Sequence, residues 1–440
     1  MLLRRDEEVN FDVMNTRFAL VCLVFLGVVG SIADAAAQNL VISNARILDG
    51  NGGVIERGAI VVRDGKIVSV SAGAAPRVAG ARTIDAGGMT MMPGFVDAHR
   101  HIIQGDAKEW LAKTGAPQMQ QFLDAGFTSV LCAICSTEGL EMKQRINSGA
   151  VKGPRLFIAN IIPLARPAAP PGGGRRGDPA RFDTSRPPLR PTQPAGAIPA
   201  DDTIKAVDAL AKAGFDYIKT VITVTPGGPE TNTLKLIVSE GRKRNLPTVT
   251  HAVSVIDTLA AVEAAPAVLM HTPHIGRLEE DAAAVQKIAK AGIPMVSTLA
   301  IFIPHFGADN TPLFRDGLPF PWDTISSGGQ GPVNARLLWE NGLTYGYGTD
   351  ASWPPRDSLK DELRALSLTF SPKDIVSILT KNAARAALRQ DIGTLEPGKL
   401  ADIVMINGDP VNDIGEVLNV VMTIKGGEVV SDKRSSRATR

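Results

Sequence analysis

The sequence predicts an α/β protein built around a parallel (β/α)8 barrel. Short apolar runs alternate with helical stretches through the middle of the chain, and repeated strand-then-helix order means parallel pairing. Polar residues suited to metal binding follow or close several of these runs, namely His99, His101, Lys219, His251, His271 and Asp350. In β/α barrels the carboxyl ends of the strands assemble the site, so residues far apart in sequence can meet there.

The composition is that of an ordinary globular enzyme. The chain has 440 residues, 44% of them hydrophobic and 21% charged, which suffices for a barrel and an accessory domain. The formal net charge is only +2, and no basic cluster with interleaved aromatics precedes the short basic tail Lys433–Arg440. Nucleic acid is therefore a poor candidate partner, whereas a homo-oligomer remains open.

Residues 1–37 have the pattern of a signal peptide. The apolar run Phe18–Gly30 follows Arg17 and leads to the small residues Ala35–Ala37. The run is shorter than the ~20 residues of a membrane span, and no Cys follows to carry a lipid. We expect a periplasmic or secreted protein without a stable membrane anchor. The acidic stretch Asp6–Glu8 suits such a leader badly, so we expect translation to start at Met14.

Residues 38–91 are expected to form a hairpin-rich β unit. Strands are expected at Leu40–Ile42, Ala45–Leu48, Ala59–Arg63 and Ile67–Ser71, with turn residues between them. A similar pattern returns in residues 397–432.

Residues 92–396 carry the barrel pattern. Strands are expected at Thr128–Ile134 and Arg155–Ile161, and helices at Thr203–Ala213, Leu234–Asn245, Val255–Ala264 and Ala282–Ala291. The segment 163–199 interrupts this rhythm with Pro, Gly and Arg, and it is far longer than the usual ~2 to 6 residue connection. It is interpreted either as a lid over the catalytic face or as a disordered decoration.

Two cysteines remain after removal of the leader. Cys132 and Cys135 are spaced as a disulfide or a redox pair could be. Because they lie in or just after an apolar run, we favour two buried, unpaired thiols.

The pair His99 and His101 is separated by one residue at the end of a strand-like segment. Side chains alternate along a strand with a period of two, so both imidazoles should point to the same side and can hold one metal ion. Arg100 should point the other way, towards the helical layer, where a buried charge needs a partner. We expect a structural ion pair there.

The ordered set of motifs resembles the amidohydrolase superfamily, in the branch of imidazolonepropionase-like and prolidase-like metal-dependent hydrolases. The resemblance covers nearly everything after residue 38. It rests on the segments Pro93–His101, Tyr217–Lys219, His251–Ala252, Gly348–Asp350, Asn382–Arg385 and Gly393–Val404. It implies that residues 38–91 and 397–432 join as a small β-sandwich beside the barrel.

The resemblance also implies a binuclear metal site. His99, His101 and Asp350 would hold the first divalent ion, His251 and His271 the second, and Lys219, carboxylated on its amine, would bridge them. Imidazole and carboxylate ligands suit zinc, although manganese, cobalt or iron could fill the same set. Such a pair lowers the pKa of a bound water from ~15.7 towards about 7, and Asp350 would act as general base and then general acid.

Four further residues are weaker candidates for substrate binding. His274 lies three residues beyond His271 and could replace it as the ligand, although His271 directly closes the apolar run. His305 follows a later run, and a loop histidine without function is an equal alternative. Arg277 and Arg356 could capture a substrate carboxylate, or could be solvated surface charges.

These observations predict an exported, binuclear-metal amidohydrolase that cleaves a C–N bond by metal-activated hydroxide. We expect its substrate to be a small amide, a dipeptide or an N-acyl amino acid. One alternative is a mononuclear cyclic-amide or amidine hydrolase, and another is a lactonase or esterase. A periplasmic metal-binding protein without turnover is the non-enzyme alternative.

Overall fold

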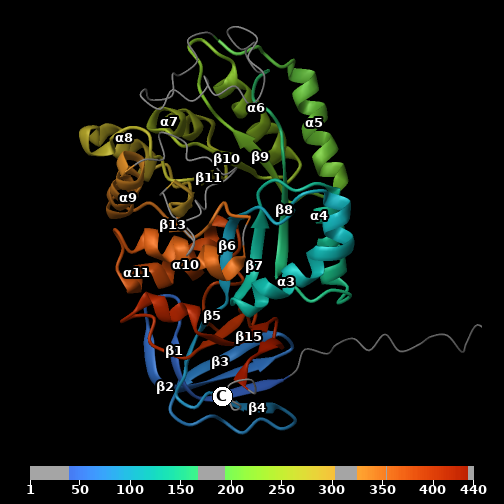
Figure 1. Ribbon diagram of the computed structural model, residues 1–440, viewed down its shortest axis with the longest axis vertical. Helices are drawn as coiled ribbons and strands as arrows, with labels where there is room; N and C mark the ends of the chain where they lie inside the picture. The colour runs from blue at the N-terminus through green and yellow to red at the C-terminus, as the bar shows by residue number, and fades with distance from the viewer. Residues whose placement is uncertain (1–38, 167–193, 303–324, 353, 435–440) are drawn as a thin grey trace, which may run out of the picture. The chain divides into compact units, whose positions relative to one another are not determined.

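A computed structural model describes residues 39–166, 194–302, 325–352 and 354–434, which are coloured in Figure 1. They belong to one compact unit, Gln38–Arg440. In this part of the chain, no helix is both long and apolar enough to cross a membrane. The predicted signal peptide, residues 167–193 of the insertion, and His305 lie outside the described residues.

Eight parallel strands form a barrel. They pair in chain order from β6 to β13, and the ring is nearly closed by backbone contacts between its ends, where Ala98 N donates to Tyr347 O at 3.1 Å. Their bounds are β6 (Phe95–Arg100), β7 (Phe127–Cys132), β8 (Arg155–Ile161), β9 (Tyr217–Val221), β10 (Thr248–His251), β11 (Val268–Met270), β12 (Met295–Val296) and β13 (Tyr345–Gly346). The predicted α/β barrel is confirmed.

Helices cover the outside of the strands (Figure 1). Several begin with side-chain caps: Asp257 N donates to Ser254 Oγ at the start of α7, and Ala284 N donates to Asp281 Oδ1 at the start of α8. The main helices are α3 (Gly115–Asp124), α4 (Thr137–Asn147), α5 (Ala200–Ala213), α6 (Glu230–Lys243), α7 (Val255–Ala264), α8 (Ala282–Ala289), α9 (Ile325–Glu340), α10 (Pro355–Leu366), α11 (Pro372–Ser377) and α12 (Ala383–Ala386).

The two terminal segments join in a second, mixed sheet, as expected. Its order is β16-β15-β14-β5-β1-β2-β3, with β4 paired to β1. The junction is the antiparallel pairing of β14 with β5, in which Ile403 lies opposite Pro93. The strands are β1 (Leu40–Leu48), β2 (Val54–Arg63), β3 (Lys66–Ala72), β4 (Arg82–Asp85), β5 (Thr90–Pro93), β14 (Ile403–Ile406), β15 (Val420–Lys425) and β16 (Glu428–Asp432).

Gly94 connects this sheet to the first barrel strand. A Cβ at this position would lie 2.4 Å from side-chain atoms of Thr128, so only glycine allows β6 to approach β7 here. The chain therefore passes directly from the mixed sheet into the strand that carries His99.

Cys132 and Cys135 form a disulfide, with their Cα atoms 6.0 Å apart. Both are buried, as predicted, but the expectation of unpaired thiols was wrong. The chain turns directly after β7, and this brings the two Cα atoms within the usual range for a disulfide.

Candidate metal centre

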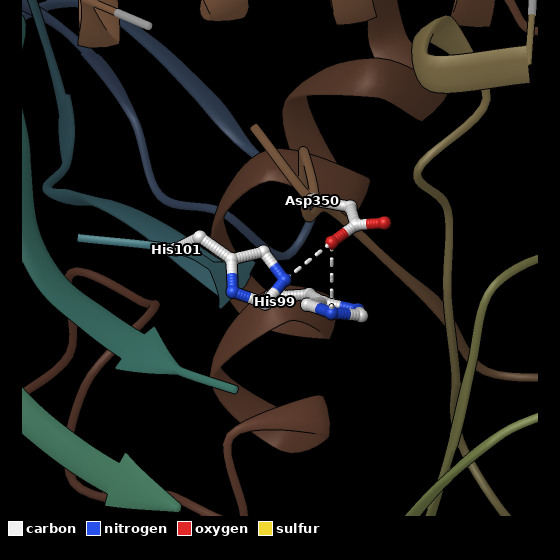
Figure 2. Close-up of side chains that lie close together, drawn as sticks. All are labelled: His99, His101 and Asp350. Carbon is white, nitrogen blue, oxygen red and sulfur yellow. Dashed lines mark ion pairs between the residues drawn. The ribbon is translucent and has the colours of Figure 1, made fainter. Parts of the chain in front are cut away.

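Two histidines and an aspartate meet at the carboxyl ends of the first and last barrel strands (Figure 2). Asp350 Oδ1 lies 2.8 Å from His101 Nε2 and 3.3 Å from His99 Nε2. The candidate ligand atoms of these three residues lie within 4.8 Å of one another. His99 belongs to β6, His101 follows it, and Asp350 follows β13, so the strand-end arrangement brings together residues from opposite ends of the barrel segment.

His271 connects this cluster to a further imidazole, that of His251. Its ring centroid lies 4.6 Å from that of His99 and 4.3 Å from that of His251. Lys219, in β9, is only 2% exposed, and its charge acts on both His99 and His271. The structure thus places all six predicted site residues in one neighbourhood.

The protonation states in this cluster suit metal binding. Burial, followed by the charge of Lys219, holds the pKa of His99 well below its ordinary value. Burial and the charge of His251 do the same for the pKa of His271. Burial alone would raise the pKa of Asp350, but His99 and the hydrogen bond from His101 hold it well below its usual range. Neutral imidazoles and an ionised carboxylate are the forms that bind divalent metals, so the donor set fits such an ion.

His271 is oriented by Thr298, a residue outside the predicted set. The Nδ1 atom of His271 lies 2.8 Å from Thr298 Oγ1, an arrangement that leaves Nε2 available as a ligand atom. The turn carrying Thr298 is held by Glu362 of α10, which accepts hydrogen bonds from Leu299 N at 2.9 Å and Ala300 N at 2.8 Å. Thr298 follows an apolar run, as the predicted ligands do, and this signal could have identified it. Nothing in the sequence indicates the role of Glu362.

Arg100 forms the predicted structural ion pair. It is fully buried, its guanidinium Nη1 lies 3.8 Å from Asp97 Oδ2, and the same nitrogen donates to Thr349 Oγ1 at 3.0 Å. Asp97 in turn accepts from His99 N at 3.1 Å and from Thr349 Oγ1 at 2.8 Å. This network fixes the backbone beside both His99 and Asp350.

His274, one of the weaker candidates, lies outside the cluster of histidines. His274 is buried and stacks on Phe302, with ring centroids 3.8 Å apart, and burial lowers its pKa to about 4. It is His271, and not His274, whose ring adjoins His99 and His251.

Arg277 is 60% exposed and pairs with Glu279 at 2.9 Å and Glu280 at 2.8 Å. Arg356 is exposed near the start of α10. Within the described residues, no hydrogen bond or ion pair joins either arginine to the histidine cluster.

Comparison with known proteins identifies the family. Residues 90–430 match the model of the amidohydrolase family. The chain belongs to this family. It is therefore a hydrolase acting on C–N bonds, and the His-His-Asp cluster fits the metal dependence of such an amidohydrolase.

Several known proteins resemble this amidohydrolase over most of its length. An imidazolonepropionase of Geobacillus thermodenitrificans (strain NG80-2) is 24% identical over 416 residues, which cover 86% of this chain and 91% of the relative. A solved Xaa-Pro dipeptidase with bound methionine has a TM-score of 0.71 at 22% identity, covering 89% of this chain and 99% of its own. A prolidase complexed with N-methylphosphonate-L-proline has a TM-score of 0.68 at 21% identity, covering 90% and 100%. The two structures show the same fold.

Proposed function

We propose that this amidohydrolase uses two divalent metal ions, bridged by a carboxylated Lys219, to hydrolyse the amide of a dipeptide or an N-acyl amino acid. His99, His101 and Asp350 would hold the first ion, and His251 and His271 the second. The observation that carries the proposal is the burial of Lys219 within electrostatic reach of His99 and His271, one histidine from each group. Nitrogen and oxygen donors without thiolate suit zinc.

A lysine in this position calls for a chemical explanation. Its cationic form would repel a metal ion. Loss of a proton from the ammonium gives the amine, and reaction of the amine with carbon dioxide forms the N–C bond of a carbamate and releases a second proton, so that a cation becomes an anion with two oxygen donors. A single metal ion would need no such bridge.

The metal ions, when bound, would lower the pKa of a water molecule and polarise the scissile carbonyl. Asp350 would provide the proton transfer, because its carboxylate is ionised at neutral pH and lies beside His99 and His101. It would accept the proton of the attacking water and deliver it to the leaving nitrogen.

The solved structures that share the fold support a dipeptide as substrate, since they include a Xaa-Pro dipeptidase and a prolidase. The imidazolonepropionases among the sequence relatives favour the alternative of a cyclic amide as substrate. Hydrolysis assays with dipeptides, N-acyl amino acids, cyclic amides and lactones would decide between these classes. We expect turnover of the first two, and a preference for cyclic amides or lactones would contradict the proposal.

The variant Asp350→Asn tests the role of Asp350 in the same assays. General acid–base catalysis contributes about 10²- to 10⁴-fold, so we expect a loss of this order in kcat while metal remains bound. Unchanged hydrolysis would remove Asp350 from the role of proton carrier.

We further propose that the protein is exported after cleavage behind Ala37. The leader-like sequence and the Cys132–Cys135 disulfide support this, because disulfides persist mainly in oxidising compartments. Mass analysis of the protein recovered from the producing cells should give an amino terminus at Gln38. An intact leader on the cytoplasmic protein would contradict export.

A further inference from the structure

A small cavity of about 280 Å³ lies at the carboxyl ends of β8 and β9. None of the six candidate ligands lines the cavity, but its lining residue Ile161 lies opposite Lys219 in the pairing of β8 with β9. Its lining includes Ile161 from β8, Val221 from β9, and Leu164 from the segment that follows β8.

Strand alternation shows which way the two strand residues point. Phe157 and Ala159 of β8, and Tyr217 of β9, belong to the cluster packed inside the barrel. With a side-chain period of two, Ile161 continues the inward row of β8, and Lys219 and Val221 continue that of β9. The row that positions Lys219 therefore ends in an apolar side chain.

These apolar residues are left exposed at the barrel mouth. Ile161 is 41% and Val221 is 39% exposed, whereas the residues below them in the same rows are buried. Two large aliphatic side chains that share one concave site beside a catalytic centre are typical of a ligand pocket.

The lining of the cavity includes two charged side chains, those of Glu230 and Arg166. Glu230 is 3% exposed, and its Oε1 accepts a hydrogen bond from Thr225 Oγ1 at 2.6 Å, whereas its Oε2 is buried without a hydrogen-bond partner among the described residues. Arg166 is exposed and makes no ion pair with the described residues. Its backbone is fixed by pairing with Gly196, through hydrogen bonds of 2.8 and 3.3 Å.

We propose that this cavity binds the amino acid part of the substrate, with its apolar side chain against Ile161 and Val221 and its carboxylate paired with Arg166. The proposal rests on the proposed function and narrows its substrate class to amides of apolar amino acids. The volume is at the lower end for ligand sites, which suits one amino acid residue. An aspartate side chain would lose hydration against the aliphatic wall without gaining a partner.

Calorimetric titration of the metal-loaded enzyme with free leucine, glycine and aspartate tests this without requiring turnover. We expect leucine to bind at least about tenfold more tightly than glycine or aspartate, as hydrophobic pockets discriminate on this scale. Val221→Thr, which keeps the shape but adds a hydroxyl, should weaken leucine binding about tenfold and leave glycine unchanged. Ile256→Ala, at an exposed position of α7, is the matched control and should change neither.

Arg166→Gln should weaken leucine binding but leave the binding of leucinol, which lacks the carboxylate, unchanged. Equal affinity for the three amino acids, or a Val221→Thr variant that behaves like Ile256→Ala, would overturn the apolar subsite. Equal effects of Arg166→Gln on leucine and leucinol would overturn the assignment of Arg166. Leucine selectivity in a protein that hydrolyses no amide would defeat the proposed function and leave the subsite standing.

Discussion

Three residues that follow consecutive strands have a strained backbone conformation. His271, Thr298 and Asp350 follow β11, β12 and β13 and have φ of 76°, 47° and 53°. Such conformations cost about 1–3 kcal/mol each in residues other than glycine and persist only where surrounding contacts enforce them. Here Asp350 N donates to His99 O at 2.7 Å and Thr298 N donates to Gly348 O at 3.0 Å. The folded backbone thus preorganises these positions.

Thr298 offers a direct test of ligand orientation. Thr298→Val keeps the side-chain shape but removes the hydroxyl that contacts His271 Nδ1. Loss of such supporting contacts typically lowers metal affinity about 10- to 100-fold, so we expect weaker binding of the proposed second ion in chelator competition and retention of the first. Thr298→Ser, which keeps the hydroxyl, should bind both ions as the wild type does. Equal affinities in the Val and Ser variants would show that the hydroxyl has no orienting role.

At the scale of the elements, the seam between β6 and the segment after β13 depends on buried charge. Arg100→Met would leave Asp97 buried without its cation, and removing one partner of such a pair costs about 3–5 kcal/mol. We expect a loss of this size in the free energy of unfolding, measured with denaturant. Combining it with Asp97→Asn should recover part of the loss. If the two changes add to within about 0.5 kcal/mol, the residues do not act as a pair.

Helix α10 makes the turn after β12 sensitive to pH. Burial raises the pKa of Glu362 from its ordinary 4.5 to about 7. The folded protein therefore keeps a proton that the unfolded chain releases above about pH 4.5, and this contribution to stability is lost as the pH rises to about 7. Glu362→Gln should lose stability at every pH by disturbing the hydrogen bonds from Leu299 N and Ala300 N.

The test is the difference in unfolding free energy between wild type and Glu362→Gln. Relative to the wild type, the unfolding free energy of the variant should rise by up to about 3 kcal/mol between pH 4.5 and 7. Asp97, whose pKa burial raises to about 6, titrates in both proteins and should largely cancel. A difference that does not change with pH would mean that Glu362 is ionised throughout this range.

At the scale of the whole molecule, local patterns predicted the architecture well. Strand β8 has the predicted bounds, and the order of strands and helices led to the barrel. The His99–His101 pair was recognisable because strand alternation places both rings on one side. Features that depend on packing between distant elements were not predictable. No periodic pattern in the sequence indicates that Glu362 would meet the turn of Thr298, 64 residues away. Nor does any such pattern indicate the turn that joins Cys132 to Cys135.

Metal analysis tests the bridged metal pair, on which the proposed chemistry depends, most directly. The mature protein, purified without chelator, should contain close to two divalent ions per chain, and Lys219→Ala should contain clearly fewer. Circular dichroism would establish that the variant is folded. One ion or none in the wild type, unchanged in a folded Lys219→Ala variant, would contradict the bridge and favour the mononuclear alternative.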